Sequence, residues 1–259
     1  HFQMLARALP YDRARQLARQ DPKRLETALL HLAGLLPEKP QEAMEESVRH
    51  YYDQLAMLRA EHFAGLRILP MDWPMNGVRP LNRPERRIAG ISRIIARTAA
   101  DGLAGQIYRI WRDPLSLAAR RKALEEMFRI PSGFWGYHCR WTGNALRRPA
   151  ALIGTDRIRV IIGNLCIPYG IMQARHERQA SIEEGVFTLF KHFPAAATNR
   201  IEQRMLERLF HPPFPRLNFS LQQGLIQLYQ DWCRDNGACS FCPMAHYMEE
   251  AVFTGKSRG

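Results

Sequence analysis

The 259-residue sequence lacks several features that would place it in a specialised class of protein. No apolar run reaches the roughly 18–20 residues that a membrane-spanning helix needs. Residues 1–20 do not show the basic start, apolar centre and small cleavage site of a signal peptide. Apolar residues make up 46% and charged residues 24% of the chain, which excludes a disordered or collagen-like protein. We therefore expect a globular, cytoplasmic protein.

Signals for β-strands are almost absent, and apolar residues recur instead at the three- and four-residue steps of helices. These steps predict an all-α fold of about ten helices in two packed halves, with a cysteine-rich helical junction near the C-terminus. The turn Pro131-Ser-Gly133 is the predicted boundary, with an N-terminal subdomain over residues 1–130 and a C-terminal subdomain over 131–259. Pro168 is expected to end the apolar helix that begins near Thr155.

Common catalytic motifs are missing as well. The sequence contains no His-Glu-x-x-His and no Gly-x-Ser-x-Gly. Gly255-Lys256-Ser257 is not a phosphate loop, because no glycine lies five residues before Gly255. Carboxylates cluster near predicted helix ends, where solvation explains them. These absences leave open whether the chain is an enzyme.

Positive charge is the first feature present in surplus. The chain has 37 Lys+Arg against 25 Asp+Glu, a formal net charge of +12. Such a surplus attracts polyanions, because binding releases the counterions of their phosphates. Arginine far outnumbers lysine, which is also typical of a compositional bias in the gene. The total charge alone leaves both explanations open.

Five arginines gather in one short segment: Arg79, Arg83, Arg86, Arg93 and Arg97. The first two lie in a loop with four prolines, and the other three share one side of the helix predicted over residues 85–99. At about 100° per residue, this side is opposite the apolar face of the helix. An exposed arginine row suits a phosphate backbone, with DNA favoured over RNA. The alternative is a solvated polar face.

The cysteines do not form a disulfide framework, but three of them lie within ten residues: Cys233, Cys239 and Cys242. A Cys-x-x-Cys turn points both sulfurs at one metal ion. The fourth ligand would be His246 in a zinc site, or Cys166 or Cys139 in a 4Fe–4S cluster. The alternative is a metal-free junction in which the cysteines pack or two of them form an adventitious disulfide.

This cysteine cluster, and the helix after Ile153-Gly154, are similar to the end of endonuclease-III-type DNA glycosylases, where four cysteines hold an iron–sulfur cluster. Here the loop after Cys233 is one residue shorter, and Met248 occupies the place of the fourth cysteine. The helix-borne lysine or aspartate of those enzymes has no counterpart. The likeness implies a glycosylase-like enzyme as one alternative function.

The order of motifs over residues 2–246 resembles an uncharacterised bacterial family, domain of unknown function 2851. The likeness is carried mainly by Arg79-Pro-Leu-Asn82-Arg-Pro84, by Asn164-x3-Pro168 and by Cys239-x2-Cys242-Pro243. It implies that these residues are the helical C-terminal portion of a longer protein, whose N-terminal half resembles a restriction endonuclease. Any nuclease chemistry would then lie outside the present chain.

We therefore expect a basic helical module that binds nucleic acid and is accessory to a nuclease-like domain. The main alternative is a structural or protein-interaction module whose arginines bind an acidic partner. Elemental analysis of the purified protein would decide between zinc, an iron–sulfur cluster and no metal.

Overall fold

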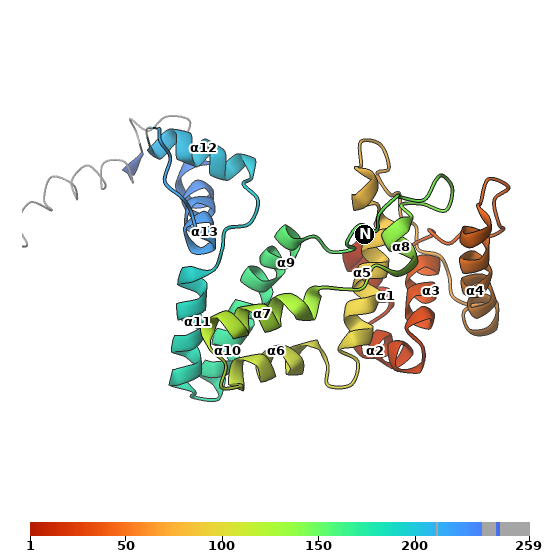
Figure 1. Ribbon diagram of the computed structural model, residues 1–259, viewed down its shortest axis with the longest axis horizontal. Coiled ribbons are helices and arrows are strands. Elements are labelled where there is room, and N and C mark those ends of the chain that lie inside the picture. The colour runs from red at the N-terminus through yellow and green to blue at the C-terminus, as the bar shows by residue number, and fades with distance from the viewer. Residues whose placement is uncertain (211, 235–241, 244–259) are drawn as a thin grey trace, which may run out of the picture. The chain divides into compact units, whose positions relative to one another are not determined.

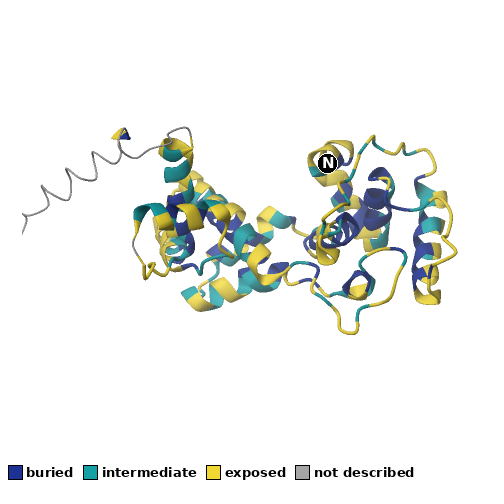
Figure 2. Ribbon diagram, turned by 90° about the horizontal axis from the view of Figure 1, so that it is seen from above, coloured by how far each residue is buried: buried dark blue, intermediate teal, exposed yellow. Residues whose placement is uncertain are grey.

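The computed structural model describes residues 1–210, 212–234 and 242–243. In these residues all named elements are helical, α1 to α13 with short 3-10 and π turns, so the predicted all-α fold is confirmed. No helix among them combines the length and the apolar character needed to cross a bilayer. The chain forms two compact units, His1–Glu183 and Glu184–Gly259. Figure 2 shows that buried residues concentrate where helices pack and that the connecting loops are mostly exposed.

The first unit begins with five helices: α1 (Phe2–Ala8), α2 (Tyr11–Gln20), α3 (Pro22–Leu32), α4 (Glu46–His62) and α5 (Pro84–Arg97). Helix α3 contacts all four others, and Figure 1 shows it between α4 and α5. The Asp21 side chain caps it by accepting a hydrogen bond from the Lys23 backbone N–H at 2.8 Å, and Pro22 occupies its first turn. Since all residues from Leu25 to Leu30 are buried, α3 is the central helix of this group.

A buried carboxyl group lies where α3 meets an aromatic cluster. Glu26 Oε1 accepts hydrogen bonds from the Tyr51 hydroxyl at 2.5 Å and from Trp135 Nε1 at 2.7 Å. Burial raises the pKa of Glu26, and these two hydrogen bonds oppose the rise. Trp135 belongs to α8 (Gly133–Tyr137) and is fully buried. The segment after residue 131 therefore packs onto α3 and α4, and the turn at 131–133 lies inside the first unit, which ends at Glu183.

Two arginines of α2 bind the carbonyl groups that follow α5. Arg15 and Arg19 each donate from Nε to the carbonyl oxygen of Ala99, at 2.5 and 2.8 Å. Each also donates from Nη2 to the carbonyl of Ala100, at 2.5 and 2.6 Å. These carbonyls lie in the turn directly after α5, so the two guanidinium groups join α2 to the end of α5.

The remaining helices of the first unit are α6 (Leu103–Arg112), α7 (Leu117–Phe128), α9 (Thr155–Ile161) and α10 (Ile167–His176). A π turn, η2 (Ile162–Cys166), joins α9 to α10, and the Ile167 N–H donates to the Ile162 carbonyl five residues back. This wider turn relieves the usual conflict of a proline with the preceding helical turn. The helix therefore continues past Pro168, and the predicted stop there is wrong.

Helices α6 and α10 approach closely at a glycine. A Cβ atom on Gly170 would lie 2.6 Å from Trp111 Nε1, so only glycine fits against this ring without a shift. Trp111 is buried, and its Nε1 donates to the Cys166 carbonyl at 3.2 Å. Burial raises the pKa of the Cys166 thiol to about 12.

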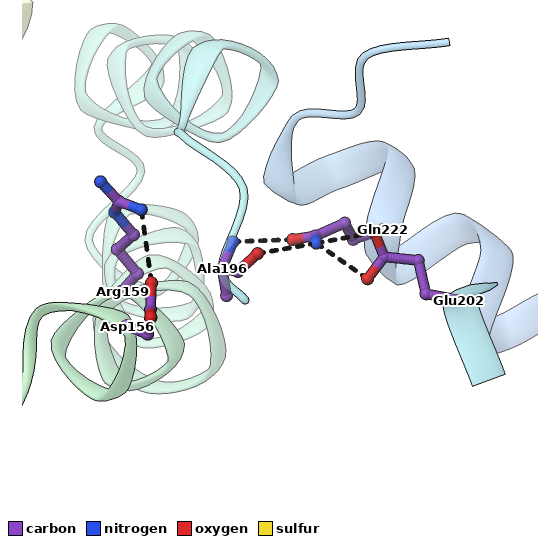
Figure 3. A network of polar contacts seen from close by, with 5 residues as sticks. All are labelled: Asp156, Arg159, Ala196, Glu202 and Gln222. Atoms are coloured by element: carbon purple, nitrogen blue, oxygen red, sulfur yellow. Dashed lines mark hydrogen bonds and ion pairs between the residues drawn. The ribbon is translucent and has the colours of Figure 1, made fainter. Parts of the chain in front are cut away.

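In the second unit, α11 (Ala180–His192, whose first residues belong to the first unit) is followed by α12 (Arg200–Leu209), α13 (Phe219–Leu228) and the π turn η3 (Tyr229–Cys233). Gln222 of α13 is buried and fully bonded (Figure 3). Its amide nitrogen donates to the Ala196 carbonyl at 3.0 Å and to both Glu202 oxygens at 2.9 Å, and its oxygen accepts from the Ala196 N–H at 2.8 Å. This satisfied network fixes the segment before α12 to both helices.

Candidate nucleic-acid interface

The proline-rich loop between α4 and α5 is fixed to the end of α3. The Leu69 N–H donates to the Leu32 carbonyl at 2.9 Å, and Trp73 Nε1 donates to the Ala33 carbonyl at 2.8 Å. Pro84 occupies the first turn of α5, where its missing N–H is not needed. The loop therefore presents its arginines from an anchored backbone.

Arg86 does not lie on the exposed row that its helical position predicts. Its side chain is completely buried, and burial lowers the pKa of the guanidinium. Its three nitrogens donate to five backbone carbonyls, those of Leu81, Trp135, His138, Ala150 and Ala151. The interpretation of Arg86 as a phosphate contact is wrong, because the segment from residue 135 to 151 covers this side of α5.

The two later arginines of the row hold the connection between α7 and α8. Arg93 is half-buried, and its guanidinium lies against Gly133, leaving no room there for a Cβ atom. Arg97 is exposed and donates from Nη1 to the Arg129 carbonyl at 3.0 Å. Both therefore have contacts within the protein that the helical pattern did not predict.

The two loop arginines differ from each other. Arg83 is partly exposed and forms an ion pair with the buried Glu85, at 3.3 Å from Nη2 to Oε1. Arg79 is exposed, and its side chain makes no hydrogen bond or ion pair within the described residues. Of the five predicted contacts, the structure leaves Arg79 the most accessible to a ligand.

Three surface pockets surround the segment from Val78 to Arg87. The isoleucine pocket, of about 260 Å³, is lined among others by Ile91, Ile94, Ile153, Asn82, Arg87 and Arg157. The tryptophan pocket, of about 490 Å³, is lined among others by His1, Phe2, Trp73, Arg79, Asn82 and Arg87. The cysteine pocket, of about 300 Å³, is lined among others by Arg83, Cys139, Arg140, Thr142 and Asn144.

These pockets are rich in basic residues and poor in acidic ones. Five arginines line them, and the described lining residues include no aspartate or glutamate. Arg87, Arg140 and Arg157 are exposed, and none of them makes a side-chain hydrogen bond or ion pair within the described chain. Asp156, the neighbour of Arg157, bonds instead to Arg159 at 3.4 Å (Figure 3). The arrangement is suited to binding an anion with several charges.

Sequence reasoning missed three of these five arginines. Arg87 lies outside the helical row that contains Arg86, and Arg140 and Arg157 are far from α5 along the chain. The signal for Arg87 was its place directly after Arg86, in a segment already rich in arginine. Nothing in the sequence pattern indicated that Arg140 or Arg157 would lie beside the proline-rich loop.

The predicted metal site lies largely beyond the described residues, which do not include Cys239 and His246. Cys233 is half-buried at the end of η3, and Cys242 is buried. Cys166, the alternative ligand, is buried in the first unit. Among the residues that the structure describes, no three potential ligands come together. The zinc or 4Fe–4S site stays a prediction.

Comparison with known proteins gives one match. No curated protein and no solved structure matches the chain significantly. A family model described as a protein of unknown function (DUF2851) matches residues 1–199. The matched residues contain all three pockets, and the cysteine motif that begins at Cys233 follows them. Since the match covers most of its length, the chain belongs to the DUF2851 family, as its motifs predicted.

Proposed function

We propose that this chain is a nucleic-acid-binding module whose pocket arginines bind phosphate groups, and that it is accessory to a nuclease-like domain. The supporting observation is that five arginines converge on three adjoining pockets without a carboxylate among the described lining residues. A guanidinium group donates two parallel hydrogen bonds to a phosphate, which gives such a cluster both affinity and orientation.

Elsewhere on the surface, basic residues are mixed with acidic ones. Arg109 pairs with Asp101 at 2.7 Å, and Arg121 pairs with Glu125 at 3.6 Å. This is the pattern of an ordinary solvated surface, where ion pairs contribute little. Of the pocket arginines, Arg83 pairs with Glu85, whereas the other four make no ion pair within the described residues, and this contrast supports their binding role.

The accessory role rests on the resemblance of the family's N-terminal half to restriction endonucleases. A helical module that holds the nucleic-acid backbone would raise the local concentration of substrate at such a domain. Longer members of the family should therefore cleave a labelled oligonucleotide more slowly when the pocket arginines are replaced. Cleavage that is unaffected by these replacements would contradict the accessory role.

Binding to labelled duplex and single-stranded oligonucleotides, measured by fluorescence anisotropy over a range of salt concentrations, tests the proposal. The triple variant Arg79→Gln/Arg87→Gln/Arg157→Gln should bind more weakly. Its plot of log affinity against log salt concentration should lose about one unit of slope for each arginine that contacts a phosphate.

A matched control removes the same charge elsewhere. Lys39→Gln/Arg49→Gln/Lys122→Gln alters three exposed residues that line none of these pockets. It should retain the affinity and the salt slope of the wild type, apart from a small effect of net charge. Equal losses in both triple variants would refute the pocket as the binding site. No binding even at low salt would refute the proposal and favour an acidic protein partner.

A further inference from the structure

We infer that the isoleucine and tryptophan pockets together hold successive nucleotides of a single strand with unstacked bases. This inference rests on the proposed function and specifies the class of nucleic acid. A duplex presents mainly phosphates and groove edges, because its base faces are stacked on one another. A single strand also offers flat apolar faces that can enter a cavity.

The isoleucine pocket has the chemistry of a base-binding cavity. Large apolar side chains at its edge remain accessible, with Leu81 49% and Ile91 39% exposed. An exposed apolar patch beside cations is suited to a ligand that is both apolar and anionic. Asn82, also in the lining, supplies an amide donor and an acceptor for a base edge.

The tryptophan pocket offers aromatic rings for stacking. The His1 and Trp73 rings stack with centroids 4.7 Å apart, and Phe2 meets the Trp73 ring edge-on at 5.5 Å. The hydrogen bond from Trp73 Nε1 to the Ala33 carbonyl fixes the orientation of the indole. Aromatic stacking accepts every base, so this pocket favours binding with little sequence preference.

The distribution of arginines between the two pockets suits a nucleotide chain. Asn82 and Arg87 line both pockets, whereas Arg157 lines only the isoleucine pocket and Arg79 only the tryptophan pocket. Each pocket thus has one arginine of its own and shares Arg87 with the other, a distribution that suits the phosphates on either side of two successive bases. The volume of the isoleucine pocket, about 260 Å³, lies just below the range of about 300–1,000 Å³ for small-ligand sites, and that of the tryptophan pocket, about 490 Å³, lies within it. Arg87 is the expected contact of the phosphate between the two bases.

Three probes of equal length test the inference on the 259-residue chain: an oligothymidylate, the same oligomer with abasic sites, and a duplex. The oligothymidylate should bind at least about fivefold more tightly than the abasic oligomer, because stacking of even one base is worth this much. It should also bind more tightly than the duplex. The abasic oligomer keeps the phosphates, so this comparison isolates the contribution of the bases.

A pocket-filling variant locates the effect. A Cβ atom on Gly154, which lines the isoleucine pocket, would meet no atom within 4 Å, so Gly154→Phe places a ring in open space there. The matched control is Gly65→Phe, at a glycine that is equally unobstructed and lines neither pocket. Gly154→Phe should remove most of the preference for oligothymidylate over the abasic oligomer, and it should weaken duplex binding less than it weakens oligothymidylate binding. Gly65→Phe should change neither.

The possible results separate the inference from the proposed function. Equal affinity of the wild type for all three probes, or tighter binding of the duplex, overturns the inference and leaves the proposed function standing. A Gly154→Phe variant that keeps the base preference, or that weakens all three probes equally, also overturns it. No binding of any probe at low salt overturns both.

Discussion

Replacing Arg86 with methionine should destabilise the first unit severely. The guanidinium has five N–H groups, and the structure shows five carbonyl acceptors, including Ala150 at 3.1 Å and Ala151 at 3.0 Å from Nη2. Because the side chain is completely buried, no water would replace it in the shortened variant without a rearrangement. The segments around residues 135–138 and 150–151 would lose their common attachment to α5.

The magnitude follows from two opposing contributions. A hydrogen bond to a charged group contributes about 1.5–3 kcal/mol, and a buried acceptor left without a donor costs about 1–3 kcal/mol. Against this, burying the cation itself costs several kcal/mol, which the methionine variant recovers. The net loss should be about 3–5 kcal/mol, because several buried carbonyls left without a donor, at about 1–3 kcal/mol each, outweigh the recovered cost of burying the cation. A typical domain has a free energy of unfolding of only about 5–15 kcal/mol.

Arg86→Lys separates charge from geometry. Lysine keeps the positive charge, but its ammonium group donates from a single point and cannot reach carbonyls from three separate segments of the chain. We expect it to recover less than half of the loss. The neighbouring Arg87 provides the control, since it is exposed, and Arg87→Met should change the free energy of unfolding by no more than about 0.5 kcal/mol.

Urea unfolding at neutral pH, followed by tryptophan fluorescence and by far-ultraviolet circular dichroism, measures all three variants. Trp135 is a direct reporter because its carbonyl accepts one of the Arg86 hydrogen bonds. An Arg86→Met variant as stable as Arg87→Met would refute the assignment of Arg86 as a structural residue. A lysine variant as stable as the wild type would show that the charge matters and the fork geometry does not.

Three further predictions concern other parts of the molecule. Burial raises the pKa of Glu26 above 4.5, so the native protein favours the protonated carboxyl group and is stabilised by it at low pH. This contribution to the free energy of unfolding should be lost as the pH rises from 4.5 through the raised pKa. The variant Glu26→Gln can still accept both hydrogen bonds at Oε1, so its free energy of unfolding in urea should lack this pH dependence. A difference in stability between variant and wild type that does not change with pH would contradict the prediction. Gly170→Ala should cost about 1–3 kcal/mol, because its Cβ would overlap Trp111. The control is Gly90→Ala, whose added Cβ would have its nearest contact at an ordinary 3.5 Å; it should be neutral or stabilising by up to about 1 kcal/mol. Equal melting temperatures of these two variants would argue against the packing at Gly170. Protein purified without oxygen should contain stoichiometric zinc or iron by elemental analysis. A metal-free protein whose melting temperature is unaffected by a chelator would exclude a metal site at the proposed ligands Cys233, Cys239, Cys242 and His246.

The helices could be predicted from the sequence wherever a single helix contains its own signal. Asp21-Pro22 marks the start of α3, and the apolar spacing of α5 predicts the helix but only part of its burial, since Ile88 is buried whereas Ile91 on the same face is exposed. The continuation through Pro168 could not be predicted in this way. It depends on a π turn, in which the hydrogen bonds skip one residue more than in an α-helix, and apolar spacing carries no signal for that change.

The candidate site was less accessible to sequence reasoning than the fold. Periodicity describes a residue relative to its own helix axis, and it correctly places Arg86 away from the apolar Ile88. It cannot show that residues 135–151 return and cover that side. The same limit concealed Arg157, which reaches the pockets only because α9 packs near α5 in three dimensions.

The carbonyl contacts of Arg15, Arg19 and Arg86 have a consequence for how ligand binding is linked to stability. In the native protein, backbone oxygens occupy these guanidinium groups, so part of the cationic surplus is withheld from solvent. Unfolding transfers those oxygens to water and makes the same cations available to a polyanion. Under the proposed function, a nucleic acid should then bind both the native and the unfolded chain. Added nucleic acid should therefore raise the melting temperature by less than mass action predicts for a ligand that binds only the native protein with the same affinity.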